Sequence, residues 1–531
     1  TSRYSIEDLY PLSPLQQGLY YHWLTNPDAA AYFVQMSFRA RGRIDIALLE
    51  QSYQILVDRH AVLRTFFTEN LLQVVQKNVK GNFHYQTING DREAAVAAYR
   101  SSDRARGFNL HTGSQMRLGV LNLGDETYEF IWSFHHILMD GWCGSILIRE
   151  FFEVYDGLLD GSMPALKPVQ PYSAYFNWLA RKDKSATLDY WKKYLSGYES
   201  VSSIPAKSVD VAGDFTVQKK RFLVDGDLRS RLRDLCADLG VTESTFIQGM
   251  WGVLLARYNN TDDVVFGAVV AGRPGEVAGI EDMIGLFINT VPVRIKIDDT
   301  GTVSSFLQSV QQESIESSAH HYVQLAEVQS ESELGRNLFD HILVYENYPV
   351  QEIIVNEDAG TSSHITLLSS TILEQTNYNL SITVNPGDAL EVSFTYNQSI
   401  FDQDQISRLA NHFYTLISHA VNQPSHTLGE LIYLTEEERL QLTRGFNNTS
   451  VAYPENDTIA HLFSRQVKQS PAAIAVEYGV AKLTYQELDT LSNQFAHYLR
   501  DNHNIAHEDL VGILLERSEW MVITILGIIK S

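Results

Sequence analysis

A strand that ends in two adjacent histidines and then turns into a helix most restricts how this chain folds. Residues 128–136, YEFIWSFHH, alternate like a β-strand, and residues 144–159 have the apolar spacing of an amphipathic helix. Because successive side chains on a strand point to opposite faces, His135 and His136 cannot both reach one small ligand. The pattern therefore argues against a metal site made by this pair. It predicts that one histidine faces a reaction space while the other supports the structure.

Asp140 and Gly141 follow the histidines where the chain turns from strand to helix. Glycine has no side chain, so a substrate or another backbone segment can approach closely at Gly141. A buried aspartate needs a cationic or hydrogen-bonding partner, and the candidates are Arg59, Arg64 and Arg273. The sequence alone does not choose among these three arginines.

The length and charge of the chain restrict its organisation and its partners. A hydrophobic core seldom grows beyond roughly 250–300 residues, so a chain of 531 residues is expected to form two or more domains. Its 64 acidic and 41 basic side chains give a formal net charge of -23. This charge repels phosphate backbones and anionic lipid, and it disfavours nucleic acid and membranes as partners. An acidic partner protein would need a local basic patch.

The cysteine content and the chain ends predict a cytoplasmic protein. Cys143 and Cys236 are the two cysteines, which is typical of a reducing compartment. No Cys/His spacing typical of zinc ligands occurs, so no metal is expected. The N-terminus lacks the features of a signal peptide, and the apolar residues 521–529 are too few to span a bilayer. Because the chain stops at Ser531 directly after an apolar run, we expect an excised fragment.

Changes of pattern along the chain predict three folded parts and a linker. Residues 1–175 mix helix and strand patterns, and glycine and proline interrupt the chain after residue 160. A second mixed region, residues 176–435, is followed by a polar linker, 436–458, and by a last segment, 459–531. The periodicity also predicts helices over 46–60, 228–258 (two, separated near residue 240) and 403–421, and strands over 264–270 and 389–396.

Residues 135–141, HHILMDG, match the HHxxxDG signature of the condensation-domain superfamily, which is similar in fold to chloramphenicol acetyltransferase. Acyltransferases and epimerization domains share this signature, so the assignment to the family also depends on the other motifs that accompany it. In the family's order, five further segments resemble the first, second, fourth, fifth and seventh condensation motifs: residues 12–18, 59–67, 172–178, 284–294 and 335–339. Two prolines of the family pattern, near 321–324 and after Asn337, are absent. The resemblance covers about residues 5–435.

The resemblance implies a mixed α/β (α+β) fold of two chloramphenicol-acetyltransferase-like lobes in a V shape, with a central tunnel. Two peptidyl carrier proteins, donor and acceptor, would insert phosphopantetheine arms into this tunnel. The acceptor amine would attack the donor thioester and form a peptide bond, and the domain itself would bind no cofactor. Holding both substrates in one cavity removes an entropic barrier of up to roughly 7–11 kcal/mol.

The resemblance also implies roles for the motif residues. His136 would act on the attacking amine as a general base or by positioning it, and histidine titrates near neutral pH, which suits either task. His135 and Asp140 would support His136, and backbone N–H groups near Gly141 would face the oxyanion. Cys143 is expected to be a buried, inert thiol. Three residues are predicted along the tunnel: Trp142, Asn289 and Thr290.

The tail resembles a second family. Residues 483–488, LTYQEL, resemble the first core motif of adenylation domains, and residues 511–518 and 527–530 resemble the opening of the second. The family's phosphate-binding loop would lie beyond Ser531, so residues 459–531 are expected to be a small, inactive α/β fragment. A condensation domain directly before an adenylation domain is the usual order of an elongation module.

Several alternatives remain open from the sequence. They are an epimerization domain, a relative that starts synthesis with a lipid chain, and a non-catalytic recruitment or scaffold domain. Epimerization domains normally follow a carrier, and a scaffold domain is expected to have lost His136. Heterocyclization domains have aspartates in place of both histidines and are excluded. The residues before Asp140 and the SPLQQ start at Ser13 favour a D-configured donor, and the identities of both substrates stay open.

Overall fold

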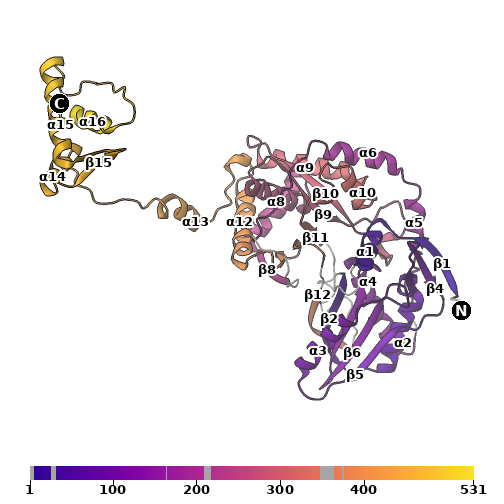
Figure 1. Cartoon of the computed structure of the whole chain (residues 1–531). Helices are drawn as coiled ribbons and strands as arrows, with labels where there is room; N and C mark the ends of the chain where they lie inside the picture. The colour runs from indigo at the N-terminus through magenta and orange to yellow at the C-terminus, as the bar shows by residue number, and fades with distance from the viewer. Residues whose placement is uncertain (1–4, 26–31, 163, 208–216, 347–363, 374–375) are drawn as a thin grey trace. The chain divides into compact units, whose positions relative to one another are not determined.

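The computed structural model describes residues 5–531 apart from 26–31, 163, 208–216, 347–363 and 374–375. It separates into two compact units, Thr1–Arg439 and Leu440–Ser531. The division between the units falls inside the predicted linker. The larger unit has the mixed α/β architecture that the sequence predicts, with helices packed against two large sheets (Figure 1).

The first large sheet has five strands in the order β12-β2-β7-β6-β5. β7 (Thr127–His135) lies at its centre, antiparallel to β2 (Phe33–Gly42) and to β6 (Met116–Gly124). Every residue of β7 is buried, because elements pack on both faces of the sheet. The two edge strands are β12 (Ile365–Leu373) and β5 (Asn82–Thr87).

Two helices cover one face of this sheet and position the histidine motif. α2 (Ile46–Arg59) begins after Asp45, whose carboxylate accepts the first free N–H groups of the helix. α4 (Gly141–Leu159) packs against α2, and both bury apolar side chains with Trp132 of β7. The expected helices and strand are confirmed, and α4 begins three residues earlier than predicted.

The second large sheet has six strands in the order β10-β9-β11-β13-β14-β8. β11 runs parallel to both of its neighbours, and the other pairs are antiparallel. The strands are β8 (Val217–Val224), β9 (Asp263–Val270), β10 (Asn289–Lys296), β11 (Ile342–Tyr345), β13 (Leu380–Asn385) and β14 (Leu390–Asn397).

Helices on one face of the second sheet enclose a separate hydrophobic core. They are α7 (Gly226–Leu239), α8 (Glu243–Asn259), α9 (Val303–Ser318) and α12 (Gln403–Asn422). Trp251 of α8 contacts the rings of Phe394 and Phe413 at the centre of this core. The predicted helices over 228–258 and 403–421 and the strands over 264–270 and 389–396 are confirmed.

Two segments of the second half of the sequence cross to the first half. β12 joins the first sheet by antiparallel pairing with β2. Residues 277–287 contribute Met283, Leu286 and Phe287 to the first hydrophobic core. A division of the chain at residue 175 therefore does not describe these crossing segments, because the amino-acid pattern around them does not reveal which core they enter.

Smaller elements complete the larger unit. A three-stranded sheet has the order β1-β4-β3 and contains β1 (Ile6–Pro11), β4 (Leu72–Gln76) and β3 (Thr65–Phe67). The remaining helices named in Figure 1 are α1 (Pro14–Thr25), α3 (Arg92–Arg106), α5 (Ser173–Leu179), α6 (Lys184–Leu195), α10 (Leu325–Ser330) and α13 (Glu436–Leu440).

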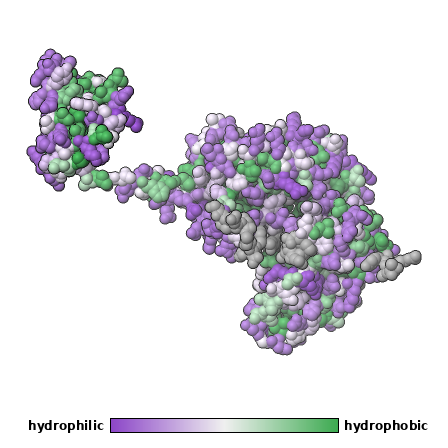
Figure 2. All heavy atoms as spheres, in the orientation of Figure 1, coloured by the Kyte–Doolittle hydropathy of each residue, from purple (hydrophilic) through white to green (hydrophobic). Residues whose placement is uncertain are grey.

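The smaller unit pairs a hairpin, β15 (Ile474–Tyr478) and β16 (Ala481–Thr484), with α14 (Ile459–Gln469), α15 (Tyr485–His503) and α16 (Glu519–Lys530). Its core is small, with Leu488, Ile523 and Leu526 buried at the centre. Apolar side chains gather on the visible surface of this unit, whereas hydrophilic residues cover most of the visible face of the larger unit (Figure 2). Among the described residues, no helix is long and apolar enough to cross a membrane.

Candidate active site

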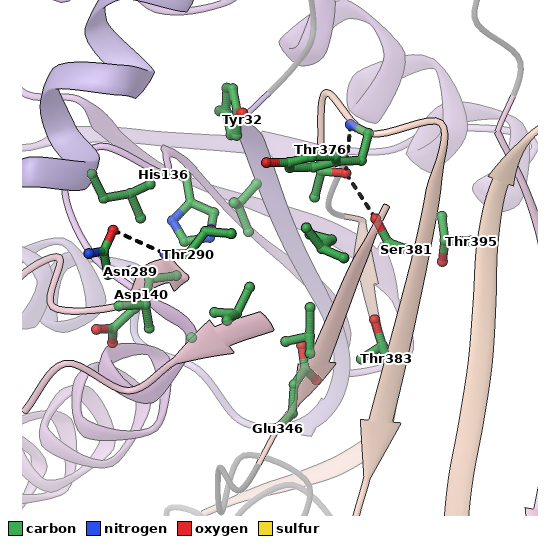
Figure 3. A pocket seen from close by; sticks show the side chains of 18 of the residues that line it. Tyr32, His136, Asp140, Asn289, Thr290, Glu346, Thr376, Ser381, Thr383 and Thr395 are labelled. Carbon is green, nitrogen blue, oxygen red and sulfur yellow. Dashed lines mark hydrogen bonds between the residues drawn. The ribbon is translucent and has the colours of Figure 1, made fainter. Parts of the chain in front are cut away.

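A cavity of about 2220 Å³ lies between the two large sheets. Residues of α1, β2 and the start of α4 line one side, and residues of β9, β11, β13 and β14 line the other (Figure 3). A site for one small ligand usually has roughly 300–1,000 Å³. The cavity therefore has room for more than one substrate.

His136 lies on the wall of this cavity, directly after the end of β7. Its backbone N–H donates to the carbonyl oxygen of Tyr32 at 2.8 Å, which holds the end of β7 beside the start of β2. Figure 3 shows the imidazole beside Asn289 and Thr290, which begin β10 in the second half of the chain. His136 therefore faces elements of both halves.

His135 is buried and serves the turn instead of the cavity. Its Nδ1 accepts the backbone N–H of Ile137 at 3.1 Å, so the ring proton of the neutral form is on Nε2. Burial, and then the neighbouring His136, lowers the pKa of His135 to about 3. The ring is therefore neutral at physiological pH, and it stabilises the turn that presents His136.

Asp140 forms a buried ion pair with Arg273. The Nη2 of Arg273 donates to Oδ1 of Asp140 at 3.1 Å, and the backbone N–H of Phe287 donates to Oδ2, also at 3.1 Å. Asp140 is the N-cap residue of α4, yet its carboxylate makes no capping hydrogen bond, because its two oxygens face Arg273 and the backbone N–H of Phe287. The pair therefore joins the histidine motif to residues of the second half.

The other two candidate arginines pair elsewhere. Arg59 donates to Glu150 of α4 at 3.0 Å, and Arg64 donates to Glu7 at 2.6 Å. Both pairs lie within the first half of the chain. Of the three arginines named from the sequence, Arg273 is the partner of Asp140.

A glycine turns Arg273 back toward the histidine motif. Gly272, two residues after the end of β9, has a φ of 58°, which is the left-handed region that side chains disfavour. A Cβ atom at this position would lie 1.8 Å from the carbonyl oxygen of Phe287. The turn and the close approach both require glycine, and together they bring Arg273 within reach of Asp140.

Cys143 is buried against the same ion pair. Its Sγ lies 3.2 Å from Oδ1 of Asp140 and 3.2 Å from the carbonyl oxygen of Gly285. Burial, followed by the charge of Asp140, raises the pKa of the Cys143 thiol. The thiol is therefore protonated at neutral pH, which is unsuitable for a nucleophile.

Asn289, Thr290 and Gly141 line the cavity. The side-chain amide of Asn289 donates to the carbonyl oxygens of His321 and Val323 at 2.8 and 2.7 Å, and its Oδ1 accepts the backbone N–H of Thr290. Asn289 therefore holds the cavity wall in shape through contacts with the α9–α10 connection.

Trp142, which the sequence places along the tunnel, is not among the described residues that line the cavity. Its indole N–H donates to the carbonyl oxygen of Glu281 at 2.9 Å. Gly141 and Gly144 share one face of α4 at a spacing of three residues, and that face lines the cavity. Trp142 points away from this face, because successive residues of a helix are rotated about 100° around its axis. The described cavity therefore does not include Trp142, which was expected along the tunnel.

Other contacts at the site were not expected from the sequence. Nε2 of the fully buried Gln16 donates to the carbonyl oxygen of Ile137 at 2.9 Å and so ties α1 to the histidine turn. Tyr32 and Phe287 hold the motif through backbone atoms, which leave no signal in residue type. Gln16 had a signal, because it lies in the motif at residues 12–18. Among the described residues, no group of three or more His, Cys, Asp or Glu side chains could hold a metal ion.

Comparison with known proteins relates the whole chain to peptide synthetases. The family model named "Condensation domain" matches residues 6–443, and the model named "AMP-binding enzyme" matches residues 463–531. Tyrocidine synthase 2 of Brevibacillus parabrevis is 37% identical over 100% of this chain, and bacitracin synthase 3 of Bacillus licheniformis is 37% identical over 99%. The chain spans 15% and 8% of those two proteins.

Solved structures share the fold. A four-domain nonribosomal peptide synthetase bound to AMP and glycine aligns with a TM-score of 0.74 at 20% identity, over 99% of this chain and 41% of that chain. The starter condensation domain of rhizomide synthetase aligns with a TM-score of 0.66 at 18% identity, over 81% of this chain and 100% of that one. By the family match, this chain belongs to the condensation domains of nonribosomal peptide synthetases over residues 6–443, and an N-terminal part of an AMP-binding domain follows.

Proposed function

We propose that residues 6–443 form a peptide bond between two carrier-bound substrates. The amine of an aminoacyl acceptor attacks the carbonyl carbon of an acyl or peptidyl thioester, the C–N bond forms, and the donor carrier's thiol leaves. The observation that carries this proposal is the position of His136 on the wall of a cavity of about 2220 Å³ between the two sheets. Tethering both substrates there would remove up to roughly 7–11 kcal/mol of entropic barrier.

His136 acts on the acceptor amine in this proposal. It either accepts the amine proton as the C–N bond forms and the thiolate is later protonated, or it positions the amine by a hydrogen bond. Asp140 is not the proton carrier, since Arg273 and the N–H of Phe287 engage both of its oxygens. Its role is to hold the start of α4 beside His136.

The start of α4 is the proposed oxyanion site. No side chain caps this helix, and the N–H of Cys143 donates to the carbonyl oxygen of Asp140. Gly141 lines the cavity, so a developing negative charge can closely approach the backbone of Gly141 at the positive end of the helix dipole. Preorganised backbone donors of this kind lower the barrier of acyl transfer.

The test is His136→Ala in a single-turnover assay with loaded donor and acceptor carriers. We expect the rate of amide formation to fall by roughly 10²–10⁴-fold, with an unchanged melting temperature. His22→Ala is the matched control, because His22 also lines the cavity but lies on α1, and it should retain the rate within a few-fold. A wild-type rate in His136→Ala would reject the proposal.

His136→Gln separates the two roles of the imidazole. An amide can position the amine but cannot take its proton, so a base role predicts that this variant behaves like His136→Ala and loses the acid limb of the pH–rate profile. A positioning role predicts a partial rate that is independent of pH near neutrality.

The remaining assignments complete the proposal. The lobes extend over residues 1–175 and 176–435, apart from residues 277–287 and β12, which join the first lobe. The partners are donor and acceptor carrier proteins in the cytoplasm, and the domain uses their phosphopantetheine arms without a resident cofactor. Residues 459–531 do not adenylate on their own, which agrees with the small core of this unit. Amino-acid-dependent ATP–pyrophosphate exchange by this chain would contradict that assignment.

A further inference from the structure

Tyr32 has a backbone conformation that tyrosine disfavours. It stands directly before β2, and its φ of 64° lies in the left-handed region, where a bulky side chain is crowded by its own backbone. Among the described non-glycine residues with a positive φ, Tyr32 and Leu71 are the two with an aromatic or aliphatic side chain, and both line the cavity. The others are Asn, Asp or Glu outside it. Strain of this kind persists only where surrounding contacts hold it, and it gathers at functional sites.

The carbonyl oxygen of Tyr32 holds His136. It accepts the backbone N–H of His136 at 2.8 Å. This bond lies one residue beyond the last pair of the β2–β7 ladder, which joins Phe33 to His135. The hydrogen bond that fixes the backbone of His136 therefore depends on the conformation of a strained residue at the end of the sheet.

The hydroxyl group of Tyr32 contacts the second half of the chain. It donates to Oδ1 of Asn377 at 2.7 Å. Burial raises the pKa of Tyr32, so the hydroxyl keeps the proton that it donates. Tyr32, His136 and Asn377 all line the cavity, and Figure 3 shows Tyr32 near His136 and near Thr376, the residue before Asn377.

The loop that carries Asn377 is fixed to the second sheet. Oγ1 of Thr376 shares a hydrogen bond with Oγ of Ser381 in β13 at 3.1 Å, and it accepts the backbone N–H of Tyr378 at 3.3 Å. Asn377 lies between these two anchored residues. Its hydrogen bond with Tyr32 therefore joins the two halves of the chain at the wall of the cavity.

The turn from His136 to Asp140 is thus tied to the second half at both of its ends, but by unequal contacts. At Asp140 the tie is a buried ion pair with Arg273. At His136 it passes through Tyr32 to one neutral hydrogen bond with Asn377, which is exposed. A neutral hydrogen bond changes an equilibrium by only about two- to tenfold. The tie at His136 is therefore the weaker one, and a single substitution can break it without unfolding the domain.

We propose that Tyr32 is a positioning residue of the condensation reaction, which holds His136 through its carbonyl oxygen and is itself held by Asn377. The inference rests on the proposed function, in which His136 acts on the acceptor amine. Without the bond to Asn377, the strained conformation of Tyr32 loses support, and His136 spends less time in place. Because Tyr32 does not touch the reacting atoms, the maximal rate changes and the binding of the carriers does not.

The first test removes the hydrogen bond from either side. Tyr32→Phe and Asn377→Ala should each lower the single-turnover rate at saturating loaded carriers by about two- to tenfold. The acceptor-carrier concentration at half-maximal rate should stay unchanged. Asn377→Asp keeps an acceptor oxygen for the hydroxyl and should retain the rate within twofold.

A double variant tests whether the two residues act as one unit. Tyr32→Phe combined with Asn377→Ala should be no slower than the slower single variant, because both substitutions remove the same interaction. Losses that multiply would give the two residues separate roles and would overturn the inference.

The amide of His136 gives a readout that does not need catalysis. In a chain with isotope-labelled histidine, the NMR signal that His136→Ala lacks identifies this amide. Its exchange with solvent should be about two- to tenfold faster in Tyr32→Phe and Asn377→Ala than in the wild type, and unchanged in Asn377→Asp. Faster exchange of all histidine amides together would show a general loss of stability and would contradict a positioning role.

Matched controls share the substitution but not the link to His136. Tyr21→Phe removes the hydroxyl of a tyrosine of α1 that also lines the cavity. Asn379→Ala changes the second asparagine of the same loop, which bonds to Asn397 at 3.2 Å. Both should keep the rate within twofold and leave the exchange of the His136 amide unchanged.

The two readouts separate this inference from the proposed function. If the chain forms no peptide bond but the exchange pattern is present, the proposed function fails and the link from Asn377 to His136 stands. If peptide bonds form and depend on His136, but Tyr32→Phe has the wild-type rate and the wild-type exchange, the inference about Tyr32 fails alone.

Discussion

Helix α4 has two buried carboxylates, at its N-cap and in its third turn, and their surroundings differ. Asp140 pairs with Arg273 from the second half of the chain, and its side chain is fully buried. Glu150 pairs with Arg59 and His60. Arg59 is the last residue of α2, His60 is its C-cap, and both belong to the first half of the chain, as Glu150 does. Asp140 lines the cavity, whereas Arg59, His60 and Glu150 are not among the described residues that line it. A neutralised buried carboxylate therefore does not by itself mark a functional site, and its position relative to the cavity does.

The largest effect is expected for Asp140→Ala. The substitution leaves the buried guanidinium of Arg273 without its carboxylate, and breaking a buried ion pair costs about 3–5 kcal/mol. Denaturant unfolding should show this loss, and amide formation by the folded fraction should fall at least about tenfold, because the start of α4 loses its anchor. Asp140→Asn, which keeps an acceptor for Phe287, should lose less of both. Unchanged stability and rate in Asp140→Ala would show that the ion pair with Arg273 supports neither the fold nor the site.

Glu150→Gln should lower stability without lowering activity. The amide keeps the shape and one acceptor oxygen but loses the negative charge that faces Arg59 and His60. Because a buried group that loses its partner costs about 1–3 kcal/mol, the free energy of unfolding should fall by that amount. We expect an earlier denaturant midpoint and a wild-type rate per folded molecule. A rate loss equal to that of Asp140→Asn would show that the two carboxylates do not differ in their effect on the site.

Acid should affect the stability contributions of His135, in the histidine motif, and of Glu150 in different pH ranges. Because the pKa of His135 is about 3 in the folded protein and 6.5 in the reference state, the unfolded chain binds a proton that the folded chain does not. The free energy of unfolding therefore falls as the pH decreases from 6.5 toward 3, by up to about 1.4 kcal/mol per pH unit. Stability measured between pH 4.5 and 7 should depend less on pH in His135→Gln.

The contribution of Glu150 to stability changes only below pH 4.5. Burial raises its pKa, but the hydrogen bonds from His60 and Arg59 outweigh burial and lower it below 4.5. Its contribution to stability is present above pH 4.5 and is lost as the pH falls through the lowered pKa. Glu150→Gln should therefore reduce the dependence of stability on pH below 4.5, and a slope below pH 4.5 equal to that of the wild type would contradict the assignment.

The smallest effect is expected for Cys143→Ala, beside the first carboxylate. The thiol contacts Asp140 and Gly285, and its raised pKa keeps it protonated. We expect a loss of about 1 kcal/mol of stability and a rate within twofold of the wild type. N-ethylmaleimide should not inhibit the native protein. A tenfold loss of rate with intact folding would give the thiol a role in the site.

Much of the local structure was predictable, since it depends on neighbours in the sequence. The apolar spacing of residues 46–60 predicts α2, and the alternation of residues 128–136 predicts β7. The apolar spacing predicts the start of α4 three residues late, although Asp140 is a residue type that favours the N-cap position. The exclusion of Trp142 from the cavity was missed because the rotation of α4 about its axis depends on packing.

The sequence by itself determined the alternation that turns His135 and His136 to opposite sides, because two neighbouring residues on a strand can do nothing else. Only the tertiary structure decided that Arg273 is the partner of Asp140, that β12 joins the first sheet, and that Asn377 contacts Tyr32. These relations join segments more than a hundred residues apart or depend on strand register. Register and packing follow from how complete sheets fit together, and no local pattern contains that information.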